Sequence, residues 1–179
     1  MHRETMMMPS HDTPPGVTRA DHTGFTVSSL DESLAFWVDV LGFRLVTRDR
    51  YPASEFLDNV VGVPGAELEL AMVEAPGGHL IELLEYSAPA NREYFKPRAC
   101  DVGSVHLAFL VDDLDALLAR VAGAGWMALG EPQTVRGGSR DGLRLFYARG
   151  PDGVTVEFLQ PPRQADGRAA GWKNSMNER

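Results

Sequence analysis

The sequence predicts an α+β fold built from two modules of one design, each a strand, a helix and three further strands (βαβββ). Two observations support this prediction. A sequence pattern occurs twice without a change in spacing, and within each copy the hydrophobic residues change from alternating to helical spacing. An internal repeat means that one supersecondary unit is used twice, so matching residues are expected at pseudo-symmetric places in the fold.

The repeated pattern has two parts. The first part reads His-x-x-Phe-x-Val-x-x-Leu-Asp-x-x-Leu-Ala and begins at His22 and again at His106. The second part reads Pro-x-Gly-x-x-Ile/Val-Glu-x-Leu and begins at Pro76 and again at Pro151. One histidine and one glutamate therefore recur at matching points of the two copies: His22, Glu82, His106 and Glu157.

In the first module, the segment that begins at His22 alternates, which predicts a strand with Phe25 and Val27 on the face opposite the histidine. Apolar residues at helical spacing then predict a helix up to Leu41, with Gly42 as its stop. The same reasoning gives the remaining elements. The remaining strands of the first module are expected at 43–50, 67–74 and 79–86. The second module should have a strand from 106, a helix over 113–124, and strands at 126–129, 143–148 and 154–160.

Alternation also decides where the two glutamates point. Glu82 lies between Ile81 and Leu83, so its side chain is expected on the face away from the core, and Glu157 is flanked in the same way by apolar residues. Both carboxylates then share the non-helical side of their sheets with the histidines. Two imidazoles and two carboxylates that converge at one point suggest a divalent metal, because buried carboxylates are costly without a partner. His79, three residues before Glu82, should point to the other face and be structural.

Composition limits the other options. A chain of 179 residues with a net charge of −8 lacks the basic surface that nucleic acid binding requires, so no nucleic acid partner is expected. Cys100 is the only cysteine, which excludes an internal disulfide. We expect a cytoplasmic protein without a membrane partner, because the sequence has neither a signal peptide nor an apolar run of about 18 residues.

The expected organisation is a flexible leader (1–18), a first module (19–86), a linker (87–102), a second module (103–161) and a flexible tail (162–179). Two longer segments, 51–65 and 131–142, are candidates for a substrate cover, and the first shows helical spacing after Ser54. Candidate pocket residues are Met72, Phe56, Arg144, Phe146 and Tyr147. Alternation alone does not decide which of the last three faces the metal.

The motifs resemble those of the vicinal oxygen chelate superfamily, which includes glyoxalase I, methylmalonyl-CoA epimerase, extradiol dioxygenases, and fosfomycin and bleomycin resistance proteins. The resemblance covers about residues 19–161. It rests on His22-Thr-Gly-Phe-Thr-Val, Leu41-Gly42-Phe43, Ile81-Glu82-Leu83, His106-Leu-Ala-Phe-Leu-Val and Pro151-Asp-Gly with Val156-Glu157-Phe158. It implies a glyoxalase-like curled mixed sheet around a metal, with the helices outside.

Glyoxalase I carries His, Glu, His and Glu at the positions that match His22, Glu82, His106 and Glu157. The resemblance therefore implies a divalent-metal-dependent lyase or isomerase (Zn, Ni, Co, Mn or Fe) that acts on a small substrate with vicinal oxygens through a metal-stabilised enediolate. It also implies that Glu157 leaves the metal to act as the catalytic base, with Glu82 second. The epimerases usually have glutamine at the position of Glu82, which moves the interpretation toward glyoxalase.

Two alternatives remain open at this point. One is an Fe(II) extradiol-type dioxygenase that uses His22, His106 and Glu157, and the other is a non-catalytic, drug-binding resistance protein. A homodimer is expected, because each module has a sheet edge and members of this family pair their modules either within a chain or across a dimer.

Overall fold

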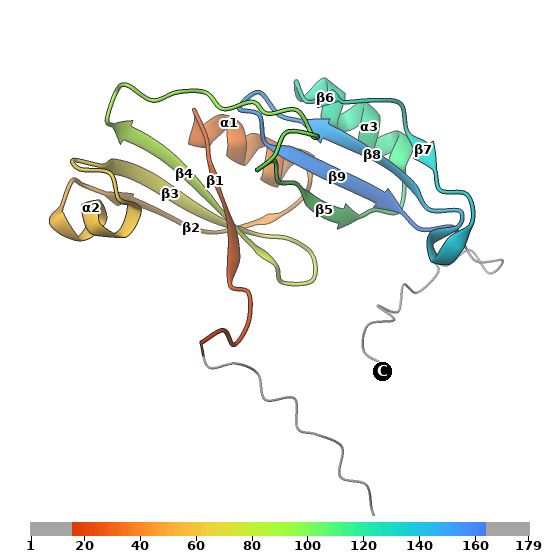
Figure 1. The fold of residues 1–179 in the computed structure, drawn as a ribbon, viewed down its shortest axis with the longest axis horizontal. Helices are drawn as coiled ribbons and strands as arrows, with labels where there is room; N and C mark the ends of the chain where they lie inside the picture. Colours follow the sequence, from red (N-terminus) through yellow and green to blue (C-terminus); the bar gives the residue numbers. More distant parts are fainter. Residues whose placement is uncertain (1–15, 164–179) are drawn as a thin grey trace, which may run out of the picture.

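The computed structural model describes residues 16–163, so most of the expected leader and tail lies outside the described residues. The strands form two mixed sheets, one in each module (Figure 1). The first sheet has the order β1-β4-β3-β2, with β1 His22–Thr26, β2 Arg44–Tyr51, β3 Glu67–Glu74 and β4 Leu80–Ala88. The second has the order β5-β9-β8-β6, with β5 Leu107–Leu110, β6 Met127–Ala128, β8 Arg144–Arg149 and β9 Thr155–Gln160, while β7 Gln133–Thr134 also pairs with β8.

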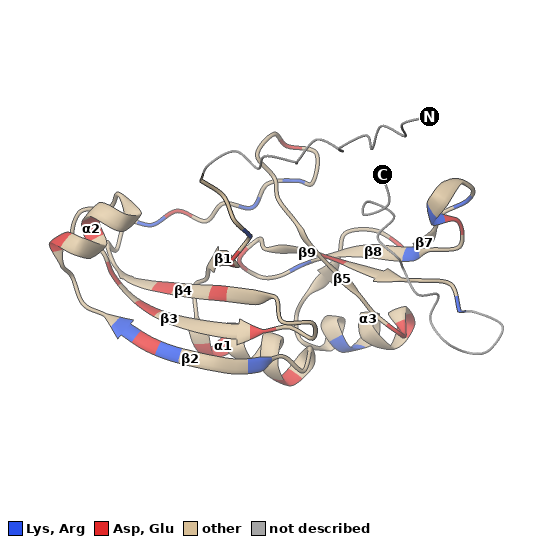
Figure 2. Cartoon of the chain, turned by 90° about the horizontal axis from the view of Figure 1, so that it is seen from below, with Lys and Arg blue, Asp and Glu red and all other residues tan. Residues whose placement is uncertain are grey.

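The main helices follow the first strand of each module. In the first module α1 Leu30–Leu34 continues into a π-helix, η1 Ala35–Val40, and in the second module the counterpart is α3 Leu114–Gly123. These helices lie on the same side of the two sheets (Figure 2). A short helix, α2 Glu55–Val61, follows β2, and a 3-10 turn, η2 Gly138–Arg140, follows β7. No helix in the described part of the chain combines the length and the apolar character that a membrane span requires.

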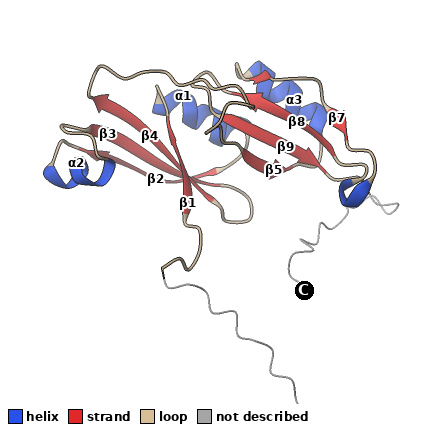
Figure 3. Cartoon of the chain, viewed as in Figure 1, coloured by secondary structure: helices blue, strands red, loops and turns tan. Residues whose placement is uncertain are grey.

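The predicted α+β fold of two βαβββ modules is confirmed, and the topology of the first sheet recurs in the second (Figure 3). β1 runs parallel to β4 and β5 runs parallel to β9, while the other pairs are antiparallel. A parallel pair requires a crossover, and in each module the helix and the following strands supply it. The first strands, β1 and β5, are therefore edge strands with a sheet partner on one side only.

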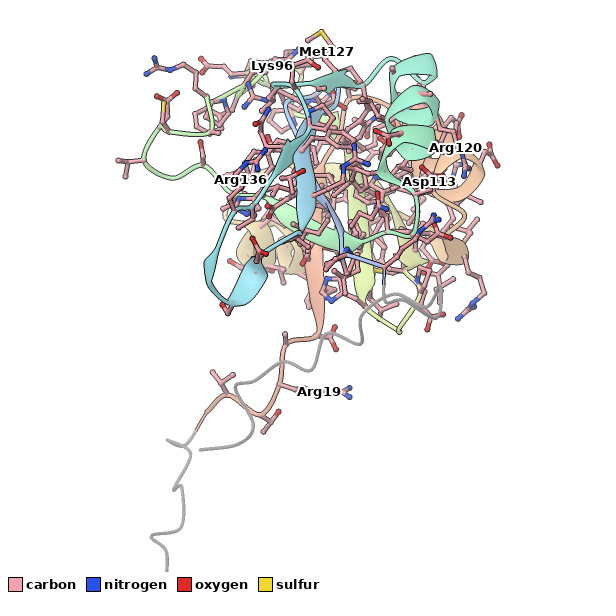
Figure 4. The ribbon with its side chains drawn as sticks, turned by 90° about the vertical axis from the view of Figure 1, so that its right-hand side faces the viewer. Arg19, Lys96, Asp113, Arg120, Met127 and Arg136 are labelled. Atoms are coloured by element: carbon pink, nitrogen blue, oxygen red, sulfur yellow. The ribbon has the colours of Figure 1, made fainter. Side chains whose placement is uncertain are left out.

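A single hydrophobic core joins the two modules. Phe36 of η1 stacks on Trp126 with ring centroids 3.7 Å apart, and Trp37 meets Trp126 edge to face. Leu30, Ile81, Val156 and other buried residues of both modules belong to the same cluster. Arg120 of α3 also donates a hydrogen bond to the carbonyl oxygen of Val40 in η1, and Figure 4 shows it where the two helices adjoin. The helix-covered faces of both sheets thus share one interior, and the opposite faces are left for the histidines and glutamates.

In both modules a side chain of the last strand forms a hydrogen bond with the first residue of the helix. Glu85 Oε2 accepts a hydrogen bond from the backbone N–H of Leu30 at 2.6 Å, and Gln160 Oε1 accepts one from Leu114 at 2.9 Å. Each acceptor stands three residues after the glutamate of the repeat. Because the first N–H groups of a helix have no partner within it, each bond satisfies such a group and fixes the last strand against the helix.

Three features differ from the sequence prediction. The first helix widens into a π-helix, in which Leu41 N–H donates to Phe36 O five residues back, and the helical spacing gave no sign of this. The segment 131–142 was predicted as a loop, but it contains β7, which pairs with β8. The predicted strand at 126–129 is reduced to β6, since Trp126 turns into the core.

Candidate metal centre

The first half-site consists of His22 and Glu82. His22 begins β1, and the parallel register sets Gly24 of β1 opposite Glu82 of β4. His22 Nε2 lies 3.4 Å from Glu82 Oε2. A Cβ atom at Gly24 would lie only 3.3 Å from the same carboxylate oxygen, so the glycine leaves the space that the glutamate side chain occupies.

The second half-site consists of His106 and Glu157 and has the same geometry. His106 directly precedes β5, and Ala108 stands opposite Glu157 of β9. His106 Nε2 lies 3.4 Å from Glu157 Oε2, the same distance as in the first half-site. The Glu157 side chain is 12% exposed and that of Glu82 is 21% exposed. Matching repeat positions therefore form matching pairs of one imidazole nitrogen and one carboxylate oxygen.

The predicted orientation of the strands that carry the glutamates is confirmed. Ile81 and Leu83, on either side of Glu82, are fully buried in the shared core, and so is Val156 beside Glu157. His79 lies outside both half-sites, where its Nε2 is 3.0 Å from Thr23 Oγ1, in line with the structural role expected for it.

The structure joins His22 to Glu82 and His106 to Glu157, but it does not join the two pairs. Within residues 16–163, no three His, Cys, Asp or Glu side chains are grouped so that they could hold one metal ion. Each half-site therefore brings together two of the four residues that the sequence predicts as ligands. The modules are connected on their helix-covered side, through the core around Phe36 and Trp126, whereas the glutamates lie on the opposite faces of the sheets.

The surroundings of the two half-sites differ. Asp21 Oδ2 lies 2.9 Å from His22 Nδ1, and this hydrogen bond raises the pKa of His22 above its usual value, against an opposing effect of desolvation. The same bond lowers the pKa of Asp21. In the second half-site the hydroxyl of Tyr147 lies 3.5 Å from His106 Nε2. Burial raises the pKa of Tyr147, and the charge of Glu157 adds to the effect.

The structure resolves the three pocket candidates on β8. Tyr147 stands opposite Glu157 in the β8–β9 register and shares its face. Phe146 is buried in the core, and Arg144 forms two hydrogen bonds of 2.8 Å with Asp115 of α3, so both lie on the helix side. Of the three candidates that alternation left open, Tyr147 is therefore the one on the glutamate face.

In the first module, Met72 stands opposite Glu82, at the position that matches Tyr147. The segment 51–65 forms α2, capped by Ser54 as its sequence indicates. Leu57 of α2 packs with Leu68, and the cluster includes Leu70, Leu84 and Tyr86, which share a face with Glu82 by register. α2 therefore covers part of the glutamate face, while Phe56 on its outer side is 72% exposed.

Asp21 is the site residue that the sequence reasoning missed. It precedes His22 directly, and the corresponding residue of the second module is Val105. This difference between the two copies was the available signal.

Comparisons with known proteins agree on the family. Residues 19–158 match the model of the glyoxalase/bleomycin resistance protein/dioxygenase superfamily. The chain is 32% identical to a 2-epi-5-epi-valiolone epimerase from Actinomyces sp. over 84% of each protein. It is 27% identical to a probable lactoylglutathione lyase from Synechocystis sp., over 81% of this chain and 97% of that protein. The crystal structure of a glyoxalase family protein from Bacillus cereus superposes with a TM-score of 0.70 at 26% identity, covering 82% of this chain and 96% of that one.

Proposed function

Since the chain belongs to the glyoxalase/bleomycin resistance protein/dioxygenase superfamily, we propose that it is a divalent-metal-dependent isomerase or lyase. Its substrate would be a small molecule with two adjacent oxygens. The observation that supports this most strongly is the recurrence of one His–Glu pair in each module at the same 3.4 Å separation. The names of the relatives, an epimerase and lactoylglutathione lyases, support the same class of reaction.

The donor set fits a divalent transition metal. Imidazole nitrogens and carboxylate oxygens suit Zn, Ni, Co, Mn and Fe. Glu82 and Glu157 are mostly covered by protein and stand on strands whose neighbouring residues are buried, a setting in which an ionised carboxylate is costly without a cation. When bound, the metal would act as a Lewis acid and polarise a carbonyl oxygen of the substrate.

The complete site would form between two copies of the chain. The first half-site of one copy would face the second half-site of its partner, so that a two-fold dimer has two equivalent four-ligand sites. The histidine of each half-site lies at an edge strand, His22 in β1 and His106 directly before β5, and each edge strand has one free side for such an approach. A groove of about 860 Å³ lies beside the edge strand β5 and is lined by residues 107–113, by Ala116, Leu117 and Arg120 of α3, and by Pro76 and His79 at the β3–β4 turn.

Within this site, Glu157 would take the proton from the carbon next to the substrate carbonyl and return it after the bonds rearrange. Its side chain is the less exposed of the two glutamates, which limits the access of water to the carboxylate. Tyr147, which stands opposite Glu157 in the β8–β9 register, would supply a hydrogen-bond donor, because a phenol hydroxyl is protonated at neutral pH and burial raises its pKa further. Glu82 has Met72 in the matching place and would serve chiefly as a ligand.

The geometry favours this reading over the dioxygenase alternative. A site of two histidines and one carboxylate would use His22, His106 and Glu157 and leave Glu82 without a role as a ligand. Glu82 nevertheless makes the same 3.4 Å approach to its histidine as Glu157 does, and Gly24 provides space for it. Both glutamates are therefore assigned to the metal.

Metal stoichiometry tests the proposal. Protein stripped of metal is titrated with Co²⁺ or Ni²⁺, and its mass in solution is measured by light scattering. We expect one tightly bound ion per chain in a dimer, with binding lost in His106→Ala and weakened in Glu82→Gln. Asp49→Val is the control, because it removes an exposed carboxylate from β2, at the opposite edge of the first sheet from His22. Tight binding that is unchanged in both half-site variants would overturn the assignment.

A further inference from the structure

The two candidate ligand histidines are held differently. His22 Nδ1 lies 2.9 Å from Asp21 Oδ2, while its Nε2 faces Glu82 Oε2 at 3.4 Å. Both carboxylates can only accept a hydrogen bond, and Asp21 is the nearer of the two, so in the neutral ring the proton is favoured on Nδ1 and the lone pair on Nε2. The ring therefore presents its lone pair on the side where the glutamate stands, in the tautomer that a metal ligand needs.

His106 has no such support. Its polar contacts among the described residues, with Glu157 Oε2 and with the hydroxyl of Tyr147, both involve Nε2. The residue in the place of Asp21 is Val105, whose side chain is exposed and offers no acceptor. Both recorded partners thus gather at the nitrogen that would bind the metal, and neither fixes the opposite nitrogen.

We propose that Asp21 is a positioning residue that fixes the tautomer and ring orientation of His22, so that the first half-site anchors the metal and the second half-site is the side that yields. This inference rests on the proposed metal site and adds that the first half-site holds the metal more firmly than the second. It also suits the role given to Glu157. A carboxylate that must leave the metal to take up a proton belongs with the histidine that is held less firmly.

Partners of this kind typically change metal affinity by about 10- to 100-fold, because they set the orientation and the basicity of the ligand. Asp21→Val, which copies the residue of the second module, should weaken binding of Co²⁺ by about that factor. Val105→Asp gives the second histidine the missing partner and should tighten binding. Asp49→Val is the control: it removes an exposed charge of the same sign from β2, the opposite edge of the first sheet.

The experiment measures Co²⁺ affinity of the full-length, metal-depleted protein by competition with a chelator at one pH, together with the ring tautomers by long-range proton–nitrogen NMR. Wild type should show His22 protonated at Nδ1, and Asp21→Val should show a mixture of tautomers with weaker binding. An affinity and a tautomer that stay at the wild-type values in Asp21→Val would overturn the inference.

The same data separate this inference from the proposed function. If wild type binds one ion per chain and His106→Ala abolishes binding, the metal site stands, whatever Asp21→Val shows. If wild type binds no ion, both the metal site and the anchoring role of Asp21 are wrong. Thermal unfolding of each variant, followed by circular dichroism, identifies any loss of affinity that arises from loss of the fold.

Discussion

Phe36→Ala should destabilise the whole molecule, because this side chain joins the two modules. Phe36 is 3% exposed, stacks on Trp126 with ring centroids 3.7 Å apart, and contacts Trp37 edge to face at 5.4 Å. Truncating a buried phenylalanine costs about 3–5 kcal/mol in cavity and lost contacts. Domains of this size have a free energy of unfolding of about 5–15 kcal/mol, so the loss is a large fraction of the total.

The assay is equilibrium unfolding in urea, followed by tryptophan fluorescence, at one fixed protein concentration because any dimer links stability to concentration. Trp37 and Trp126 adjoin the substituted ring and report on this core. Phe56→Ala is the control, since that ring is exposed on α2 and its loss should change stability by about 0.5 kcal/mol or less. A loss in Phe36→Ala below about 1 kcal/mol would refute the idea of a shared core.

Three further predictions concern the site and its charges. Glu157→Gln should lower turnover by about a hundredfold to ten-thousandfold while the protein retains some metal, and Glu82→Gln should lower turnover less. Turnover is measured by screening hemithioacetals, acyl thioesters and catechols. Equal losses in the two variants would remove the special role of Glu157. In the metal-free protein the raised pKa of His22 should fall in Asp21→Val by NMR titration. The contribution of the Asp21–His22 pair to folding stability is fully present below about pH 6.5, the ordinary pKa of histidine, and is lost as pH rises through the folded pKa. The pKa of Asp115, lowered by its hydrogen bonds with Arg144, should rise in Arg144→Leu. The contribution of this ion pair to folding stability is present above about pH 4 and is lost as pH falls through the folded pKa. If the pKa does not shift, the ion pair does not persist in solution.

Short-range regularities allowed the sequence to predict most of the framework. Alternation along a strand has a period of two, so the buried Ile81 and Leu83 determine the direction of Glu82, and the structure agrees. The unchanged spacing of the repeat indicated that His106 and Glu157 would reproduce the first pair, which they do at the same distance. Ser54 identified the start of α2 for an equally local reason, since its hydroxyl caps the helix.

Other features depend on contacts that no local pattern records. The orientation of Arg144, Phe146 and Tyr147 depends on the register of β8 against β9, and a shift of one residue reverses every side chain. The π-helix contains Phe36 and Trp37, whose rings contact Trp126 of the other module, and no local pattern indicates that contact. A repeat also shows that two half-sites are equivalent without showing whether they belong to the same copy of the chain, and that distinction is decided by how the modules pack.

The central claim is that half-sites from two copies form one metal centre, and a mixing experiment tests it most directly. One variant carries His22→Ala with Glu82→Gln, and the other carries His106→Ala with Glu157→Gln, so that each destroys one half-site. Neither variant alone should bind Co²⁺ tightly. After the two are unfolded, mixed in equal amounts and refolded, about half of the dimers should contain one of each chain, and each mixed dimer should have one intact site. We predict recovery of about one ion for every four chains. Tight binding by wild type without any recovery in the mixture would contradict a centre shared between copies.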